Sequence, residues 1–308
     1  MTELLFILEN ISLPILLLIL VGFIFQKIFK MDVPTLTRLL IYLLIPVVVF
    51  VKIMDADVTW ALMLAVTGYM LLLQMAVYIV GWITGRLMRQ TPGMRSVTIN
   101  AMVLINTGNY GIPLVDLTFG ANPLATASQL FIVVIQNITT NTFGVFQLCK
   151  GRMPRKQAWL SVAKMPALYV LALAVLLKSC DAQIPSLVMI PLNYLSDSFI
   201  AVALLGLGAQ LAEVKVGKGF SRAAIVGVIK SVTTPLLGFA LVLLLGIKGI
   251  LAQALVIGVS TPTAVSSAAM AREFDAEPGY AAQLVLVTTV LCTVTLPFII
   301  SFLKWFYA

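Results

Sequence analysis

A short polar stretch, LINTGNYGIP at residues 104–113, interrupts two apolar runs and carries groups that can bind a ligand. Two asparagine amides and a threonine hydroxyl can donate or accept hydrogen bonds, and two glycines permit backbone angles that other residues avoid. A proline lacks an N–H, which suits the first turn of a restarting helix. The candidate substrate-binding residues in this stretch are Asn106, Thr107, Gly108, Asn109, Tyr110, Gly111 and Pro113.

A second stretch of similar chemistry, STPTAVSS at residues 260–267, interrupts an apolar run later in the chain. Hydroxyl groups surround its proline, and Thr261, Pro262 and Thr263 join the candidate substrate-binding residues. We expect short helices to restart at Pro113 and near Thr263, with their N-terminal ends aimed at the membrane centre. Each such end carries about half a positive charge and free N–H groups, which makes it an anion site.

The alternative to a binding site is a pair of proline kinks whose small residues only allow close helix packing. Unpaired backbone groups cost several kcal/mol in hydrocarbon, so unwound chain survives only where protein or a wet cavity satisfies it. Two interruptions with similar chemistry favour the binding site. We expect carboxylate contacts from Asn106, Asn109, Thr261 and the backbone amides beside Pro113 and Thr263.

The elements around these stretches are too apolar for a soluble domain, because 61% of the 308 residues are hydrophobic and only 10% are charged. Apolar runs of about 20 residues, the length that crosses the hydrocarbon core, recur along the chain. A transmembrane barrel would alternate in polarity instead, so we predict an all-α polytopic membrane protein. The ten predicted spans are 11–29, 36–54, 60–84, 97–120, 127–148, 158–178, 187–212, 222–247, 250–271 and 281–303.

Lysine and arginine are distributed unequally between the two sets of loops. Fifteen of the 20 follow odd-numbered spans and four lie on the opposite side. Positive charge marks the cytoplasmic side, so we expect a multi-pass protein of the bacterial inner membrane with both termini outside. The net charge of +8 then reflects orientation and requires no nucleic-acid partner. Acidic residues precede the first apolar run, unlike the basic start of a signal peptide, so we expect a retained span.

The two polar stretches also indicate an internal repeat. Aligning VLINTGNYGIP with VIGVSTPTAVS requires an offset of about 153 residues, near half the chain. We therefore predict two repeats, 1–150 with spans one to five and 151–308 with spans six to ten. Because five is odd, the second repeat enters the membrane from the opposite side. The repeats are then inverted, and the broken spans four and nine cross near the midplane, as in many secondary transporters.

Several other chemistries are disfavoured by the residues that the sequence contains. The chain has no histidine, and its cysteines at 149, 180 and 292 are scattered, which disfavours histidine-based metal sites, nucleophile pairs and disulfides. Only Asp116 and Asp197 are available for an intramembrane aspartyl pair. The sequence lacks a phosphate-binding GxxxxGK[ST] loop. We therefore expect no enzyme activity, no cofactor and no metal.

Two charges inside predicted spans are further candidates, because a charge at the bilayer centre costs about 2.5–3.5 kcal/mol. Lys230 in span eight could snorkel to the interface, balance a substrate anion, pair with Asp116 or replace a coupling cation. Asp116, placed in the first turn after Pro113, could offset the helix dipole or, when desolvated, carry a proton. Polar residues of span five could line a cavity or join helices, namely Gln129, Gln136, Asn137 and Asn141.

The stretches NTGNYGIPLVDLTFG at 106–120 and TPTAVSSAAMAREF at 261–274 resemble the bacterial auxin efflux carrier family, distant relatives of the plant PIN-type auxin transporters. The likeness covers the whole chain and includes KSVTTPL at 230–236. It implies the fold of bile-acid and sodium/proton transporters, with a scaffold from spans 1, 2, 6 and 7 and a transport domain from spans 3–5 and 8–10. One departure is that the second interruption has no asparagine beside its proline.

The resemblance further implies elevator-like transport of small organic anions, such as auxin-like or mono- and dicarboxylic acids, and a homodimer through the scaffold. We therefore expect a secondary transporter, a permease or efflux carrier, with its site between the two interruptions. A uniporter, a proton symporter through Asp116 and a sodium-coupled symporter of the bile-acid type are the alternatives for its driving force. A membrane sensor that binds a ligand without moving it is the alternative from another class.

Overall fold

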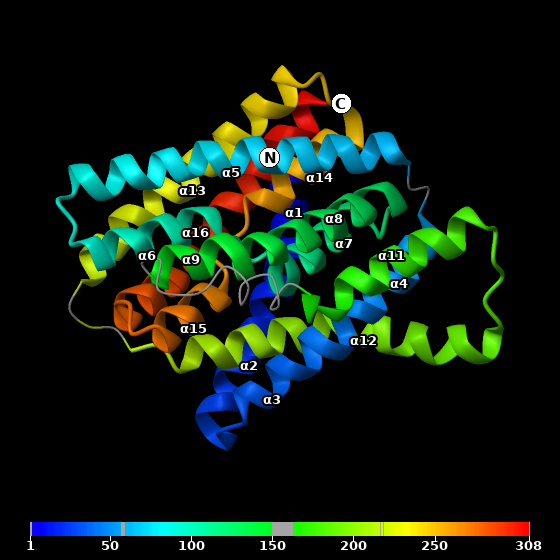
Figure 1. Ribbon diagram of the computed structural model, residues 1–308, viewed down its shortest axis with the longest axis horizontal. Helices are drawn as coiled ribbons and strands as arrows, with labels where there is room; N and C mark the ends of the chain where they lie inside the picture. The colour runs from blue at the N-terminus through cyan, green and yellow to red at the C-terminus, as the bar shows by residue number, and fades with distance from the viewer. Residues whose placement is uncertain (1, 57–58, 150–162, 216, 218, 308) are drawn as a thin grey trace.

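The computed structural model describes residues 2–56, 59–149, 163–215, 217 and 219–307. Most of this part of the chain is helical, and its only β-type pairing is an isolated bridge between Ile105 and Thr263 (Figure 1). Within the same ranges, seven helices are long and apolar enough to cross a membrane. The chain is therefore a multi-pass helical membrane protein, in agreement with the hydropathy pattern.

All five predicted spans of the first half are helical. Spans one, two and five each contain a π-helical turn, labelled η, and span four is broken at residues 104–106. The bounds are α1 Thr2–Ile7, η1 Leu8–Ser12 and α2 Leu13–Phe29 for span one, α3 Val33–Leu39, η2 Leu40–Leu44 and α4 Ile45–Asp55 for span two, α5 Trp60–Leu87 for span three, α6 Pro92–Val103, η3 Thr107–Gly111 and α7 Ile112–Phe119 for span four, and α8 Pro123–Thr139, η4 Thr140–Gly144 and α9 Val145–Cys149 for span five.

The second half repeats this order of continuous and broken helices. Its bounds are α11 Pro166–Ser179, α12 Ser186–Ala212, α13 Phe220–Leu244, α14 Gly249–Val259, α15 Val265–Glu273 and α16 Pro278–Phe306. Residues 158–162 at the start of span six lie outside the described residues, as does most of the basic central loop. The division into two repeats of five spans, and their opposite orientation in a membrane, stay predictions.

Three of the π-helical turns end two residues before a proline, and one of them is Thr107–Gly111 before Pro113. The turn Leu8–Ser12 precedes Pro14, and the turn Leu40–Leu44 precedes Pro46. A proline inside a helix donates no N–H, and its ring clashes with the carbonyl of the fourth residue before it. The wider π turn relieves this clash, so spans one and two stay helical through their prolines.

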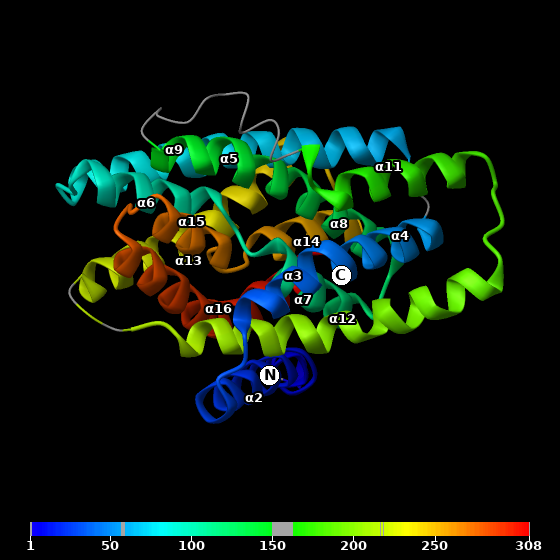
Figure 2. The same cartoon turned by 60° about the horizontal axis from the view of Figure 1, so that its bottom comes forward.

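The helices sort into two groups by their contacts. In the first group, α2 crosses and packs against α12, and α4 packs against α11 and α12 (Figure 2). The backbones of α2 and α12 approach so closely that a Cβ added at Gly208 would lie 1.9 Å from the carbonyl oxygen of Ile19. In the second group, α5, α6, α8 and α13 to α16 contact one another. Helix α4 also contacts α8 of the second group. The assignment of the first group to a scaffold and of the second to a transport domain stays a prediction.

The half-helix α14 is enclosed by the second group. Residues 252–259 of this helix are buried without interruption, although the helix has only 11 residues. Its neighbours are α8, α13, α16 and α7. Because residues 252–259 are covered by protein, the interruption that follows α14 opens into the interior of the molecule rather than toward lipid.

Candidate functional site

The two interruptions pair with each other through their backbones. The Asn106 amide donates to the carbonyl oxygen of Pro262 at 2.8 Å, and the Ala264 amide donates to that of Leu104 at 2.9 Å. This antiparallel pairing satisfies groups that unwound chain would otherwise leave unpaired in a buried place. The broken spans four and nine therefore meet at the positions that the sequence singled out.

The first helix restarts six residues earlier than we expected. The turn η3 begins at Thr107, directly after the paired residues, and continues without a break into α7. Pro113 therefore lies inside this helix, and the prediction that it opens the helix is wrong. The physical reason is the backbone pairing, which ends at Asn106 and leaves the next residue free to turn. The first-turn amides belong to Gly108, Asn109 and Tyr110, which lack a carbonyl one turn earlier.

The second helix, α15, begins at Val265 with Ala264 as its N-cap residue. This start agrees with a helix that restarts near Thr263, and whether the amides beside Thr263 contact a carboxylate stays a prediction. The Thr263 amide itself donates to the Thr288 hydroxyl oxygen at 3.0 Å, because Thr263 lies in the backbone pairing rather than in the helix. The amides at the opening turn of α15 are those of Val265 and Ser266. Nothing in the sequence marked Thr288, which lies on α16, as part of the crossing.

The hydroxyls of the second interruption bond to carbonyl oxygens at helix ends. The Ser260 hydroxyl donates to Val256 O at 2.6 Å, and the Thr261 hydroxyl donates to Gly258 O at 3.1 Å. Both acceptors belong to the last turn of α14, and Val256 O also accepts from the Ser260 amide at 3.1 Å. The hydroxyl oxygens still have lone pairs that can accept a hydrogen bond. These side chains therefore close the end of α14 with neutral groups.

Lys230 closes the corresponding end of α6. Its side chain is only 2% exposed, and its Nζ donates to Ala101 O at 2.6 Å and to Met102 O at 3.4 Å. The Thr263 hydroxyl donates to the same Ala101 oxygen at 2.9 Å. This geometry contradicts the snorkelling interpretation, and it also contradicts a pair between Lys230 and Asp116. The ammonium group instead lies against the negative end of a half-helix.

Gln129 of α8 lies between the two broken helices. Its Nε2 donates to the Thr107 carbonyl oxygen at 2.7 Å. A Cβ added at Gly111 would lie 2.4 Å from this nitrogen, and one added at Gly258 would lie 2.1 Å from Oε1. The two glycines therefore leave the room that the amide occupies. Of the two interpretations of the polar residues in span five, Gln129 fits the one in which they join helices.

The first interruption also faces the helices of the first group. The turn η3 contacts α12, and a Cβ added at Gly108 would lie 3.6 Å from Cδ1 of Ile45 on α4. The Asn106 side chain is 7% exposed, and its Nδ2 has no hydrogen-bond partner among the described residues. A buried amide without a partner loses its hydration without compensation. Asn106 is therefore a hydrogen-bond donor at the crossing that is available to a ligand.

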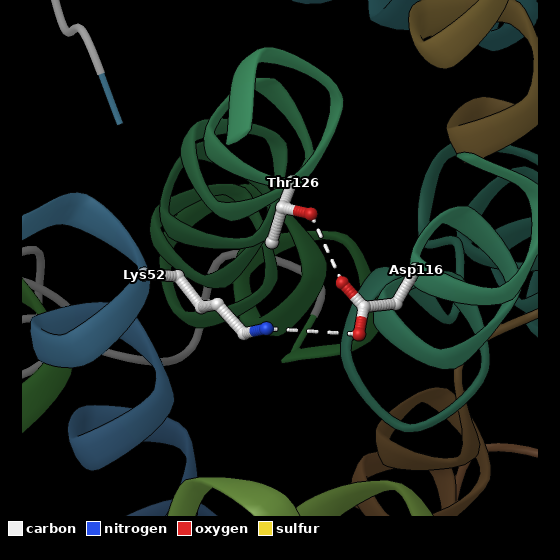
Figure 3. Close-up of polar contacts among 3 residues, drawn as sticks. All are labelled: Lys52, Asp116 and Thr126. Atoms are coloured by element: carbon white, nitrogen blue, oxygen red, sulfur yellow. Dashed lines mark hydrogen bonds and ion pairs between the residues drawn. The ribbon is translucent and has the colours of Figure 1, made fainter. Parts of the chain in front are cut away.

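Asp116 lies away from the crossing and pairs with Lys52 (Figure 3). Its Oδ2 is 3.8 Å from Lys52 Nζ, and its Oδ1 accepts a hydrogen bond from the Thr126 hydroxyl at 3.0 Å. Asp116 is the fifth residue of α7 and lies outside its first turn, which disfavours the alternative in which it offsets the helix dipole. That alternative assumed a helix start at Pro113. The pair joins α4 of the first group to α7 and α8.

The crossing brings together most of the candidate residues. Of these, Asn106, Thr107, Gly111, Thr261, Pro262 and Thr263 lie in the paired segments, beside them or against Gln129. Gly108 and Asn109 are half-buried in the first turn of the restarted helix, and Tyr110 is buried. Lys230 reaches the end of α6, and Asp116 belongs to a separate ion pair. Whether the gathered residues bind substrate stays a prediction.

Two comparisons with known proteins agree with this architecture. Residues 152–300 match the family described as membrane transport protein. An uncharacterized transporter of Methanocaldococcus jannaschii is 24% identical to this chain over 292 residues, which cover 91% of this chain and 94% of that protein. The similarity to a transporter thus extends over nearly the full length of both chains. Both matches are to membrane transport proteins, and this chain is therefore similar to proteins of that class.

Proposed function

We propose that this protein is a secondary carrier of small organic anions that binds a carboxylate where the two interruptions meet. The observation that carries the proposal is the backbone pairing of Ile105 with Thr263, which holds the N-terminal ends of η3 and α15 beside one another. Each helix end offers about half a positive charge together with free amides. A carboxylate is the small organic group that this arrangement suits, and the similarity to a transporter favours transport over catalysis.

The contacts that we propose combine one side chain with backbone. Asn106 Nδ2 is a buried donor without a partner among the described residues. The first-turn amides of η3 and α15 supply further donors, and Asn109, Tyr110 and Thr261 lie beside them. Lys230 is assigned no direct contact with the substrate, because two carbonyl oxygens already accept from its Nζ. Neutral donors at helix ends bind a carboxylate without burying a second free charge.

Transport in this proposal is alternating access of an elevator type in an inner membrane. Support comes from the position of the first interruption, which contacts α12 and lies next to Ile45 of α4. The substrate would thus be held between the proposed transport domain and the proposed scaffold of α2, α4, α11 and α12. Gradient and membrane potential drive the anion. Orientation with both termini outside and dimerisation through the scaffold belong to the same proposal.

The first test is a thermal-shift screen of the purified protein with auxin-like, C3 to C5 dicarboxylic and bile acids, followed by counterflow in proteoliposomes with each acid that stabilises it. Losing one hydrogen bond to a charged ligand costs about 1.5–3 kcal/mol. Asn106→Ala should therefore weaken binding by roughly tenfold to a hundredfold. The unliganded variant should keep its melting temperature, because the backbone bonds at this residue remain.

Two further variants sharpen this test. Asn109→Ala tests the half-buried amide of the same turn. Asn141→Ala is the matched control, because this asparagine is also half-buried but bonds to the carbonyl oxygen of Asn137 within its own helix. Equal weakening by Asn106→Ala and Asn141→Ala would move the site elsewhere, and no stabilisation by any acid would contradict the anion class. Saturable binding without counterflow would identify a sensor.

A further inference from the structure

The oxygen atoms around Lys230 form a small cluster at the end of α6. Ala101 O and Met102 O belong to the last turn of this half-helix, and both accept from the lysine Nζ. The Thr263 hydroxyl oxygen bonds to Ala101 O from the second interruption. The cluster thus contains oxygens from both broken spans, and a cation lies among them that belongs to a third helix, α13.

The positive charge of Lys230 has no carboxylate partner in the part of the chain that the structure describes. The ion pair found there joins Lys52 to Asp116, and no group of three metal-ligating side chains occurs in the same residues. A buried charge is costly unless it is paired and hydrogen-bonded. The partner of Lys230 is therefore the carboxyl-terminal end of α6, which carries about half a negative charge.

The second broken helix ends without any such cation. The carbonyls at the end of α14 accept from the neutral hydroxyls of Ser260 and Thr261. The ends of the two half-helices are therefore neutralised differently, and among the described residues only the end of α6 has a cation that bonds to its carbonyls. In broken-helix transporters, half-helix ends and unwound carbonyls are the groups that coordinate the coupling cation. Carbonyl and hydroxyl oxygens at the end of α6 are ligands of this kind.

We propose that the Lys230 ammonium is a tethered cation that occupies a site where a free monovalent cation would otherwise bind, so that this transporter works without sodium. An ammonium and a sodium ion carry the same charge and both take oxygen partners. Because the lysine cannot leave, the end of α6 stays neutralised throughout the cycle. The inference rests on the proposed transport function for its consequence, but the site itself can be tested without transport.

The test of the site is thermal stability in sodium chloride and in choline chloride at equal ionic strength. Lys230→Ala removes the tether and leaves its volume open, so sodium should raise the melting temperature of this variant saturably. A hundredfold excess of sodium over its dissociation constant would shift the unfolding equilibrium by about 100-fold. Lys230→Met removes the charge but fills the volume, and should be destabilised without rescue. The parent protein should melt at the same temperature in both salts.

Lys178→Ala is the matched control. The Lys178 Nζ also donates to a backbone carbonyl, that of Met54 at 2.7 Å, but its side chain is only partly buried and it lies at the end of α11 away from the crossing. This variant should show no difference between the two salts. The proposal is overturned when sodium stabilises Lys178→Ala as much as Lys230→Ala, when it stabilises neither, or when Lys230→Ala cannot be purified folded even in sodium.

A transport measurement completes the experiment and separates the two proposals. Initial uptake by the parent protein should be equal in sodium, potassium and choline media, whereas uptake by Lys230→Ala should rise with sodium. A parent protein that requires sodium overturns the tethered-cation proposal even when the anion is carried as expected. A parent protein that carries no tested anion in any medium contradicts the proposed function, while the melting temperatures still decide whether Lys230 fills a cation site.

Discussion

The ion pair between Lys52 and Asp116 should slow the movement of the proposed transport domain. Lys52 lies on α4 and Asp116 on α7, and Lys52 Nζ is 3.8 Å from Asp116 Oδ2 (Figure 3). An elevator movement of α7 and α8 past α4 would separate these charges. The pair therefore stabilises the state that the structure represents, and Asp116→Asn should make leaving this state easier.

The size of this effect follows from distance and exposure. Two unit charges at about 4 Å attract by about 4 kcal/mol at an effective dielectric constant of 20 and by about 1 kcal/mol in water. The two side chains are 25% and 14% exposed, and the separation is longer than a hydrogen bond, so the net value should approach that of a surface pair. If removing the ion pair destabilises only this starting state, by about 1 kcal/mol, the rate of movement out of it should rise about fivefold.

The assay is the initial rate of counterflow at saturating substrate in proteoliposomes, for the parent, Asp116→Asn, Lys52→Met and the double variant. Each single variant should be faster, and the double variant should be no faster than either, because all three lose the same interaction. Thr126→Val is the control, since it removes the hydrogen bond at 3.0 Å but leaves both charges. Fully additive effects, or slower single variants, would refute the reasoning. A pH dependence of uptake that Asp116→Asn abolishes would instead assign proton transfer to this carboxylate.

Two further substitutions test the packing around the site. Gly258→Ala should lower the free energy of unfolding by about 1–3 kcal/mol, because its Cβ would lie 2.1 Å from Gln129 Oε1 and displace the amide between the broken helices. Chemical denaturation measures this loss. The control is Gly68→Ala, where no atom lies within 4 Å of the added Cβ, and it should stay as stable as the parent. A stable Gly258→Ala protein would show that Gln129 can move freely. Tyr280→Phe should lower the free energy of unfolding by about 1–3 kcal/mol, because the tyrosine hydroxyl forms hydrogen bonds with Gln90 at 3.0 Å and with Thr98 at 3.0 Å in a buried cluster. The melting temperature of the variant measures this loss. An unchanged melting temperature would mean that Gln90 and Thr98 satisfy each other's hydrogen bonds.

The interruptions were predictable because their residues conflict with the surrounding sequence. Glycine, proline and side-chain amides inside apolar runs have few uses in a continuous membrane helix. The positions of the restarted helices were not predictable from the same residues. Pro113 is a good first-turn residue in isolation, but the pairing of Asn106 with Pro262 sets the start of the helix, and that contact joins distant parts of the chain.

The partners of the buried polar groups were equally beyond local reasoning. The sequence identified Lys230 and Asp116 as unusual because charges inside apolar runs are costly. Their partners, the carbonyl oxygen of Ala101 and the ammonium group of Lys52, depend on how helices from different parts of the chain pack. The role of Gln129 depends on the room left by Gly111 and Gly258, which only the packed structure defines.

The crossing of the broken spans constrains how this protein can be made. The Thr263 hydroxyl and the Ala101 carbonyl that it contacts are 162 residues apart in the chain. During synthesis the interruption of the first half therefore has no backbone partner until span nine is inserted into the membrane. Closing such a long loop is entropically costly and slow, so the crossing should form late in biogenesis. A chain that stops at the central loop would contain five spans and half of the crossing, and its exposed polar backbone would make it a substrate for membrane quality control.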